Sequence, residues 1–183
     1  MISDTTNKRY GTLTIALHWI MLLLIVAVYA TINLRELYPK GSDPREALKA
    51  LHFMLGLTVL ILVIIRIPAR FQGGTPAITP ELNTWQKIAS NGSHGLLYLM
   101  MIFMPLLGWL TLSAVGKVIP FYGFSFPALI SENKDTAELL KEIHETIGTI
   151  GYYVIAIHAS GALFHHFIKR DNTLIRMLPN FKK

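Results

Sequence analysis

The sequence predicts an all-α integral membrane protein, a four-helix bundle that forms one domain over residues 1–183. Two observations lead to this fold class. Of the 183 residues, 52% are hydrophobic and only 15% are charged, which is too apolar for an ordinary soluble domain. Four stretches also contain no Asp, Glu, Lys or Arg: 11–34, 50–65, 88–116 and 146–168. About 20 apolar residues cross a bilayer core, so three stretches are long enough and the second needs its flanks.

The helices are predicted at about 12–34, 45–67, 85–114 and 137–169. The polar segment 1–10, before the first helix, is expected to be loosely ordered. Before the second helix lies a turn-rich loop, in which Asp43 is the expected N-cap and Pro44 suits the first helical position. We expect Arg66 and Pro68 to close this helix.

The third helix contains Pro105, which predicts a kink near its middle. The connection 115–134 is rich in aromatic residues and broken by Gly and Pro, so it is predicted to be a lid at the membrane interface rather than a fifth span. After the fourth helix, the tail 171–183 is expected to be short and either amphipathic or loose.

The distribution of basic residues predicts the orientation. With four spans both termini share one side, which holds ten basic and three acidic residues, against seven and eight on the other side. Basic residues favour the cytoplasmic side, so we expect a multi-pass protein with both termini cytoplasmic. The net charge of +6 is then a topology signal, and no nucleic-acid motif accompanies it. The chain has no cysteine, which excludes disulfides, thiolate metal sites and covalently attached haem.

The fourth predicted helix carries four of the seven histidines. His144 and His158 are fourteen residues apart, which places them on nearly the same helical face about 21 Å apart. His52, in the second helix, is predicted at the outer depth of His144. His18, in the first helix, is predicted at the inner depth of His158. The sequence therefore predicts two cross-helix histidine pairs within the membrane, where ionisable residues are candidates for function.

Two neutral imidazoles from facing helices are the usual axial ligands of a b-type haem. Glycine follows three of the four histidines by about one helical turn, as Gly56, Gly148 and Gly161, and can make room for a macrocycle or for close helix packing. We therefore predict two haem b groups, the outer one held through its iron by His52 and His144 and the inner one by His18 and His158.

The sequence also resembles the bacterial cytochrome b561 family, in particular the branch that includes superoxide oxidase. The resemblance extends over almost the whole chain. It is carried by LHW around His18, LHFMLG around His52, HETIGTIGY from His144, IHASGALFHHF around His158, DNTLIRMLP in the tail and LRELYPKGS in the first outer loop. It implies a protein of the bacterial inner membrane that binds two haems b and transfers electrons between the periplasmic side and ubiquinone, with superoxide as a possible donor.

Three histidines lie outside the predicted pairs. His94 is interpreted either as a hydrogen-bonded interior histidine or as a partner of a quinone. His165 is an alternative inner ligand or a polar group near a quinone, and His166 is expected at the membrane interface. For an anionic donor, five outer basic residues are expected to form a positive funnel: Arg35, Lys40, Arg45, Lys49 and Lys117.

Two other functions remain open at this stage. The same haems would serve a redox subunit that relays electrons for a partner dehydrogenase, hydrogenase or periplasmic cytochrome. Without haem, the histidines would form a path for metal ions or protons.

Overall fold

The computed structural model describes residues 9–179, so residues 1–8 and 180–183, which belong to the segments expected to be loose, lie outside it. Within the described chain, four helices are long and apolar enough to cross a membrane. They are α1 (Thr12–Leu34), α2 (Asp43–Gln72), α3 (Thr84–Ala114) and α4 (Lys134–Phe164). The predicted all-α membrane bundle is confirmed.

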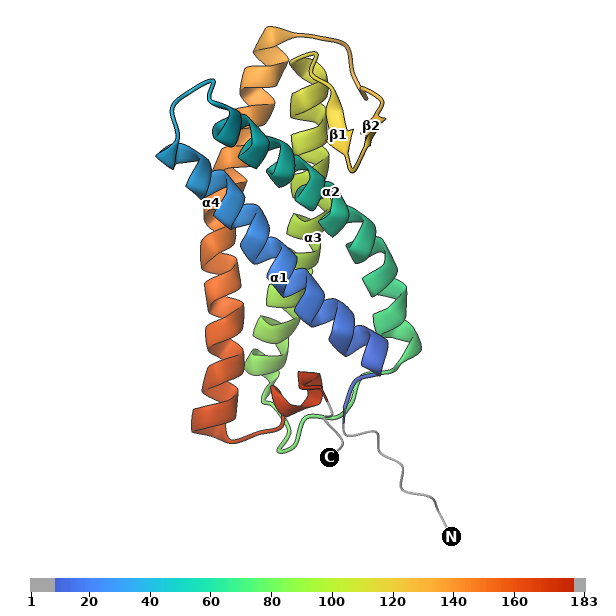
Figure 1. Cartoon of the computed structure of the whole chain (residues 1–183). Coiled ribbons are helices and arrows are strands. Elements are labelled where there is room, and N and C mark those ends of the chain that lie inside the picture. Colours follow the sequence, from blue (N-terminus) through green and yellow to red (C-terminus); the bar gives the residue numbers. More distant parts are fainter. Residues whose placement is uncertain (1–8, 180–183) are drawn as a thin grey trace.

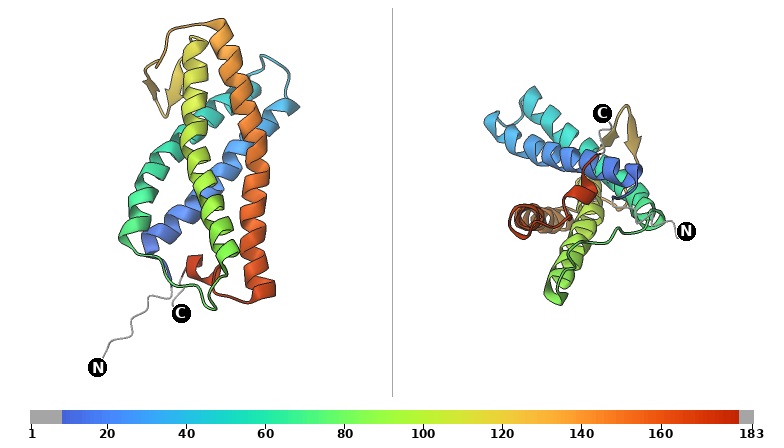
Figure 2. Two further views of the ribbon diagram at one scale, coloured as in Figure 1. Left: turned by 180° about the vertical axis from the view of Figure 1, so that it is seen from behind. Right: turned by 90° about the horizontal axis from the view of Figure 1, so that it is seen from below.

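The four helices form two pairs (Figures 1 and 2). Helix α1 packs along α2, and α3 packs along α4, while α2 also contacts α3. A core cluster of Met21, Val59 and Val63 joins α1 to α2, and side chains of α3 cover it. The backbone of α4 makes few close approaches to α1 and α2. Side chains therefore make most of the contacts between α4 and these two helices.

The helix ends differ by a few residues from the predicted ones. Ser42, rather than Asp43, is the N-cap of α2, and this helix continues through Pro68 to Gln72. The Thr14 hydroxyl donates to the Ala69 carbonyl at 3.1 Å, which satisfies one group in the extra turn. Helix α4 begins three residues early because the Asn133 side chain accepts from the Thr136 amide.

The outer connection contains a β-hairpin that the sequence analysis did not predict. Strands β1 (Ile119–Phe121) and β2 (Phe124–Phe126) pair antiparallel beside α2 and α3. Tyr122 and Gly123 form the two-residue turn with φ of 43° and 90°, the positive values that tight hairpin turns require. Ile119 is almost fully buried against the outer parts of α2 and α3, which fixes the hairpin to the bundle.

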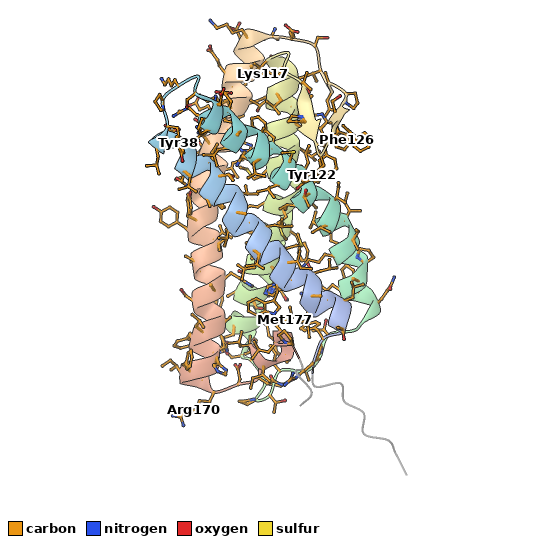
Figure 3. All side chains as sticks on the ribbon, viewed as in Figure 1. Tyr38, Lys117, Tyr122, Phe126, Arg170 and Met177 are labelled. Carbon is orange, nitrogen blue, oxygen red and sulfur yellow. The ribbon has the colours of Figure 1, made fainter. Side chains whose placement is uncertain are left out.

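The tail, expected to be amphipathic or loose, forms short helical turns across its described residues. A turn of π-helix, η2 (His165–Lys169), ends α4, and a short 3-10 helix, η3 (Ile175–Met177), follows. The tail crosses beneath α1, where the Trp19 indole donates to the Met177 carbonyl at 2.8 Å (Figure 3). The buried Arg176 guanidinium donates to the Pro76 carbonyl in the loop between α2 and α3. These contacts hold α1, that loop and the end of α4 together.

Candidate functional site

The outer histidine pair joins α2 to α4. The ring centres of His52 and His144 are 6.3 Å apart and their planes differ by 75°. His52 Nδ1 lies 3.0 Å from the Val28 carbonyl, which can only accept, so Nδ1 carries the proton and Nε2 keeps a free lone pair. The pair therefore presents at least one nitrogen that is ready to bind a metal.

His144 packs against a glycine of α3. A Cβ added to Gly108 would lie 3.4 Å from the His144 ring, which is van der Waals contact. The two helices therefore meet closely at this imidazole. His144 Nδ1 is buried and has no hydrogen-bond partner among the described residues.

The inner histidine pair joins α1 to α4 with nearly the same spacing. The ring centres of His18 and His158 are 6.4 Å apart and their planes differ by 68°. Two imidazoles that bind one metal from opposite sides, through bonds of about 2 Å each, place their ring centres roughly 6 Å apart. Both predicted pairs meet this spacing, whereas His94 and His158, at 5.0 Å, are closer than it requires.

Arg66 contacts the inner pair directly. This residue is 6% exposed and donates to His18 Nδ1 at 3.2 Å and to the Thr14 carbonyl at 3.3 Å. A guanidinium only donates, so His18 accepts at Nδ1 and the neutral ring carries its proton on Nε2. The pair fits haem in spacing, but iron binding through Nε2 requires Arg66 to release Nδ1. The sequence places Arg66 at the inner end of the second helix but does not predict its contact with His18.

The glycines near the histidines divide into two groups. A Cβ on Gly56 or Gly161 would meet no other atom within 4 Å, so the space beside both glycines is open and neither is required for close helix packing. Gly148 differs, because it faces Met104 and its carbonyl accepts from the Tyr29 hydroxyl at 2.8 Å. Gly148 therefore serves a contact between α1 and α4 rather than the space beside a histidine.

His94 lies beside the inner pair on α3. Its ring meets that of His158 edge-on, and its Nδ1 lies 2.6 Å from the Ser90 carbonyl. Nδ1 therefore donates, and Nε2 is left with a lone pair that can accept a proton. The neighbouring Ser93 hydroxyl lies 3.5 Å from His158 Nδ1.

His165 and Asp171 link the end of α4 to the tail. His165 Nδ1 lies 2.5 Å from the Asp171 carboxylate, and the Thr173 amide donates to the same carboxylate at 2.8 Å. Burial alone would raise the pKa of the Asp171 carboxyl, but these hydrogen bonds together outweigh burial and lower its pKa. His166, the neighbouring histidine, has a buried Nδ1 without a partner among residues 9–179.

The outer basic residues do not all face solvent as free charges. Arg45 is 8% exposed and donates to the Glu36 carboxylate and to two carbonyls of the first outer loop. Arg35 also pairs with Glu36, and Lys49 pairs with Glu46. Of the five predicted funnel residues, only Lys40 and Lys117 are exposed and without an ion pair in the described chain.

Four apolar helices that bring histidines together in cross-helix pairs define a class of protein, the membrane cytochromes of the b type. Residues 9–180 match the family described as prokaryotic cytochrome b561, and the chain belongs to that family. It is therefore a multi-pass bacterial membrane protein of electron transfer, and its family membership implies b-type haem.

Named relatives align over nearly their whole length. Cytochrome b561 homolog 1 of Escherichia coli (strain K12) is 38% identical over 96% of this chain and 99% of its own. The probable superoxide oxidase CybB of Yersinia pestis is 34% identical over 94% and 97%. Cytochrome b562 of Cereibacter sphaeroides is 30% identical over 95% and 98%.

Proposed function

We propose that this protein is a di-haem superoxide oxidase, which passes electrons from superoxide on the periplasmic side to ubiquinone near the cytoplasmic side. The observation that supports two haems is the nearly equal ring spacing of two separate histidine pairs, 6.3 Å for His52 and His144 and 6.4 Å for His18 and His158. The choice of superoxide as donor is supported by the similarity to the probable superoxide oxidase CybB of Yersinia pestis. Haem held at each pair would supply one-electron carriers at two depths of the membrane.

The orientation is part of the proposal, with both termini on the cytoplasmic side. The two ends of the described chain meet at one end of the bundle, where the Arg9 guanidinium donates to the Pro179 carbonyl at 3.3 Å. The same end carries the excess of basic residues, which favours the cytoplasm. His52 and His144 then form the periplasmic pair.

The residues around each pair suit different steps. Lys40 and Lys117 give an anionic donor a positive outer surface. Two superoxide ions each give up one electron and leave as O₂, while ubiquinone takes up two electrons and two protons and leaves as the quinol. On the inner side, His94 can carry protons at Nε2, and His165, oriented by Asp171, can bring them from the cytoplasm.

Rapid mixing of superoxide with the purified, oxidised protein tests the donor. We expect the haem absorption to change to the reduced form within the dead time or shortly after it. The double variant Lys40→Gln and Lys117→Gln should slow this reaction several-fold at low salt and much less at high salt, because exposed charges are screened. The variant Lys87→Gln, on the cytoplasmic side, is the control. A wild-type protein that superoxide does not reduce would exclude this donor and favour a relay subunit for a partner protein.

A further inference from the structure

Arg66 is a buried positive charge inside a membrane-spanning helix. It is 6% exposed and belongs to α2. Its hydrogen bonds go to the Thr14 carbonyl and to His18 Nδ1, which are both neutral acceptors. No carboxylate of the described chain forms an ion pair with this guanidinium. A buried charge without an opposite charge is costly, and an ionisable group within a span marks a site of function.

Arg45 shows how the same chain balances a buried arginine at its outer end. It is 8% exposed, close to the value for Arg66, and its guanidinium donates to both carboxylate oxygens of Glu36. Two carbonyls of the first outer loop accept from its other nitrogen. The buried outer arginine is therefore paired with a carboxylate of the chain, and the buried inner arginine is not.

Two further arginines add to the positive charge at the inner end. Arg70 follows Arg66 by one turn of α2, and Arg176 comes from the tail. Both guanidinium groups lie over the Tyr10 ring, at 5.9 and 5.6 Å from its centre. Arg176 is 6% exposed, and its buried Nε has no hydrogen-bond partner in the described chain. The only buried carboxylate there, that of Asp171, is already bound at the end of α4.

The contact with His18 connects this charge to the inner pair. While Arg66 donates to His18 Nδ1, the proton of the neutral ring is on Nε2. A haem iron bound through Nε2 requires the proton on Nδ1 instead, so Arg66 must then turn to another acceptor. Haem b carries two propionate carboxylates, and a guanidinium binds a carboxylate through two parallel hydrogen bonds.

We propose that Arg66 binds a propionate carboxylate of the inner haem, and that it changes partner from His18 Nδ1 to this propionate when the haem is bound. The exchange balances the buried charge of Arg66 and frees His18 for the iron. The outer pair needs no such exchange, because no arginine of the described chain hydrogen-bonds to His52 or His144. This assignment rests on the proposed function, because it requires haem at the inner pair.

Transfer of haem to excess apomyoglobin tests the role of Arg66. The loaded His144→Ala chain keeps only the inner pair complete, so it isolates the inner haem. Adding Arg66→Gln should speed the loss of this haem about ten-fold, the effect of one charge-assisted hydrogen bond. Lys87→Gln, which removes an exposed positive charge from the same end, should leave the rate unchanged. Equal rates with and without Arg66→Gln would overturn the assignment.

The dimethyl ester of haem tests the carboxylate itself. Esterification removes both negative charges and leaves the iron and the macrocycle unchanged. From the His144→Ala chain, the ester should dissociate about ten-fold faster than haem, and Arg66→Gln should abolish this difference. The first of these comparisons keeps Arg66, so it does not depend on how a variant at this position folds. Equal rates for ester and haem in its presence, or a difference that survives Arg66→Gln, would contradict the propionate contact.

The phosphate of an anionic phospholipid is the other source of an opposite charge. If Arg66 bound it, haem would be retained longer in nanodiscs of phosphatidylglycerol than of phosphatidylcholine, and the ester would dissociate no faster than haem. That result would overturn the assignment. A His144→Ala chain that holds no haem would refute the inner haem of the proposed function and this contact with it. Haem that is held there but responds to neither esterification nor Arg66→Gln would refute this contact alone.

Discussion

The outer and inner histidine pairs have almost the same spacing but very different surroundings. In the outer pair, His52 donates to a backbone carbonyl and His144 packs against Gly108. The inner pair is surrounded by Arg66, Ser93 and His94. The outer pair therefore has neutral backbone neighbours, whereas the inner pair has a guanidinium, a hydroxyl and a third imidazole beside it.

The largest effect is expected on haem content, when one histidine of either pair is replaced. With haem held at both pairs as proposed, His144→Ala and His158→Ala should each reduce the haem content from two to one per chain, because each would remove one histidine of a different pair. His52→Ala should match the first variant and His18→Ala the second.

The measurement is haem stoichiometry together with the reduced-minus-oxidised spectrum. His166→Ala, which changes a histidine outside both pairs, is the control and should keep two haems. Unchanged haem content in both His144→Ala and His158→Ala would contradict the pairing.

A smaller effect tests the charge difference between the pairs. Arg66→Gln should lower the midpoint potential of the inner haem by some tens of millivolts, because a nearby positive charge favours the form with one more electron. The outer haem should keep its potential, since Arg66 lies beside the inner pair only.

A redox titration followed at visible wavelengths measures both potentials. Arg35→Gln, at the outer end, is the matched control. Equal shifts of both haems in Arg66→Gln would mean that its charge does not distinguish the two sites.

The smallest expected effect concerns the tail next to the inner side. Because the pKa of Asp171 is lowered in the folded protein, its hydrogen bonds stabilise the fold above the unfolded pKa, and this stability is lost as pH falls through the folded pKa. Asp171→Asn should therefore be less stable than wild type at neutral pH, with the difference shrinking as the pH becomes strongly acidic.

Thermal unfolding of both proteins across this pH range provides the test. Glu81→Gln is the control, because Glu81 is 89% exposed and its ion pair with Lys87 contributes little. A stability difference that does not change with pH would show that Asp171 acts through packing alone.

The sequence predicted the features that depend on local composition and helical period. The four spans follow from runs without charge, and the fourteen-residue interval between His144 and His158 follows from the helix repeat. The structure brings His52 to His144 and His18 to His158, as matching their depths in the membrane predicts. Their role as haem ligands stays a prediction.

The remaining features depend on contacts between distant residues, which no local pattern encodes. Arg176 reaches Pro76 across one hundred positions, and Arg66 reaches His18 across forty-eight. The hairpin had a weak local signal, since Tyr122 and Gly123 stand between aromatic residues at a spacing that allows a two-residue turn.

Helix α4 supplies one histidine to each pair, and it is the last of the four spans to be synthesised. Helices α1 to α3 can enter the membrane while the chain is still being made, but neither pair is complete until α4 joins them. Assembly of both sites is therefore a late event, after translation of the spans is finished. A chain truncated before α4 lacks both His144 and His158, so it can form neither histidine pair.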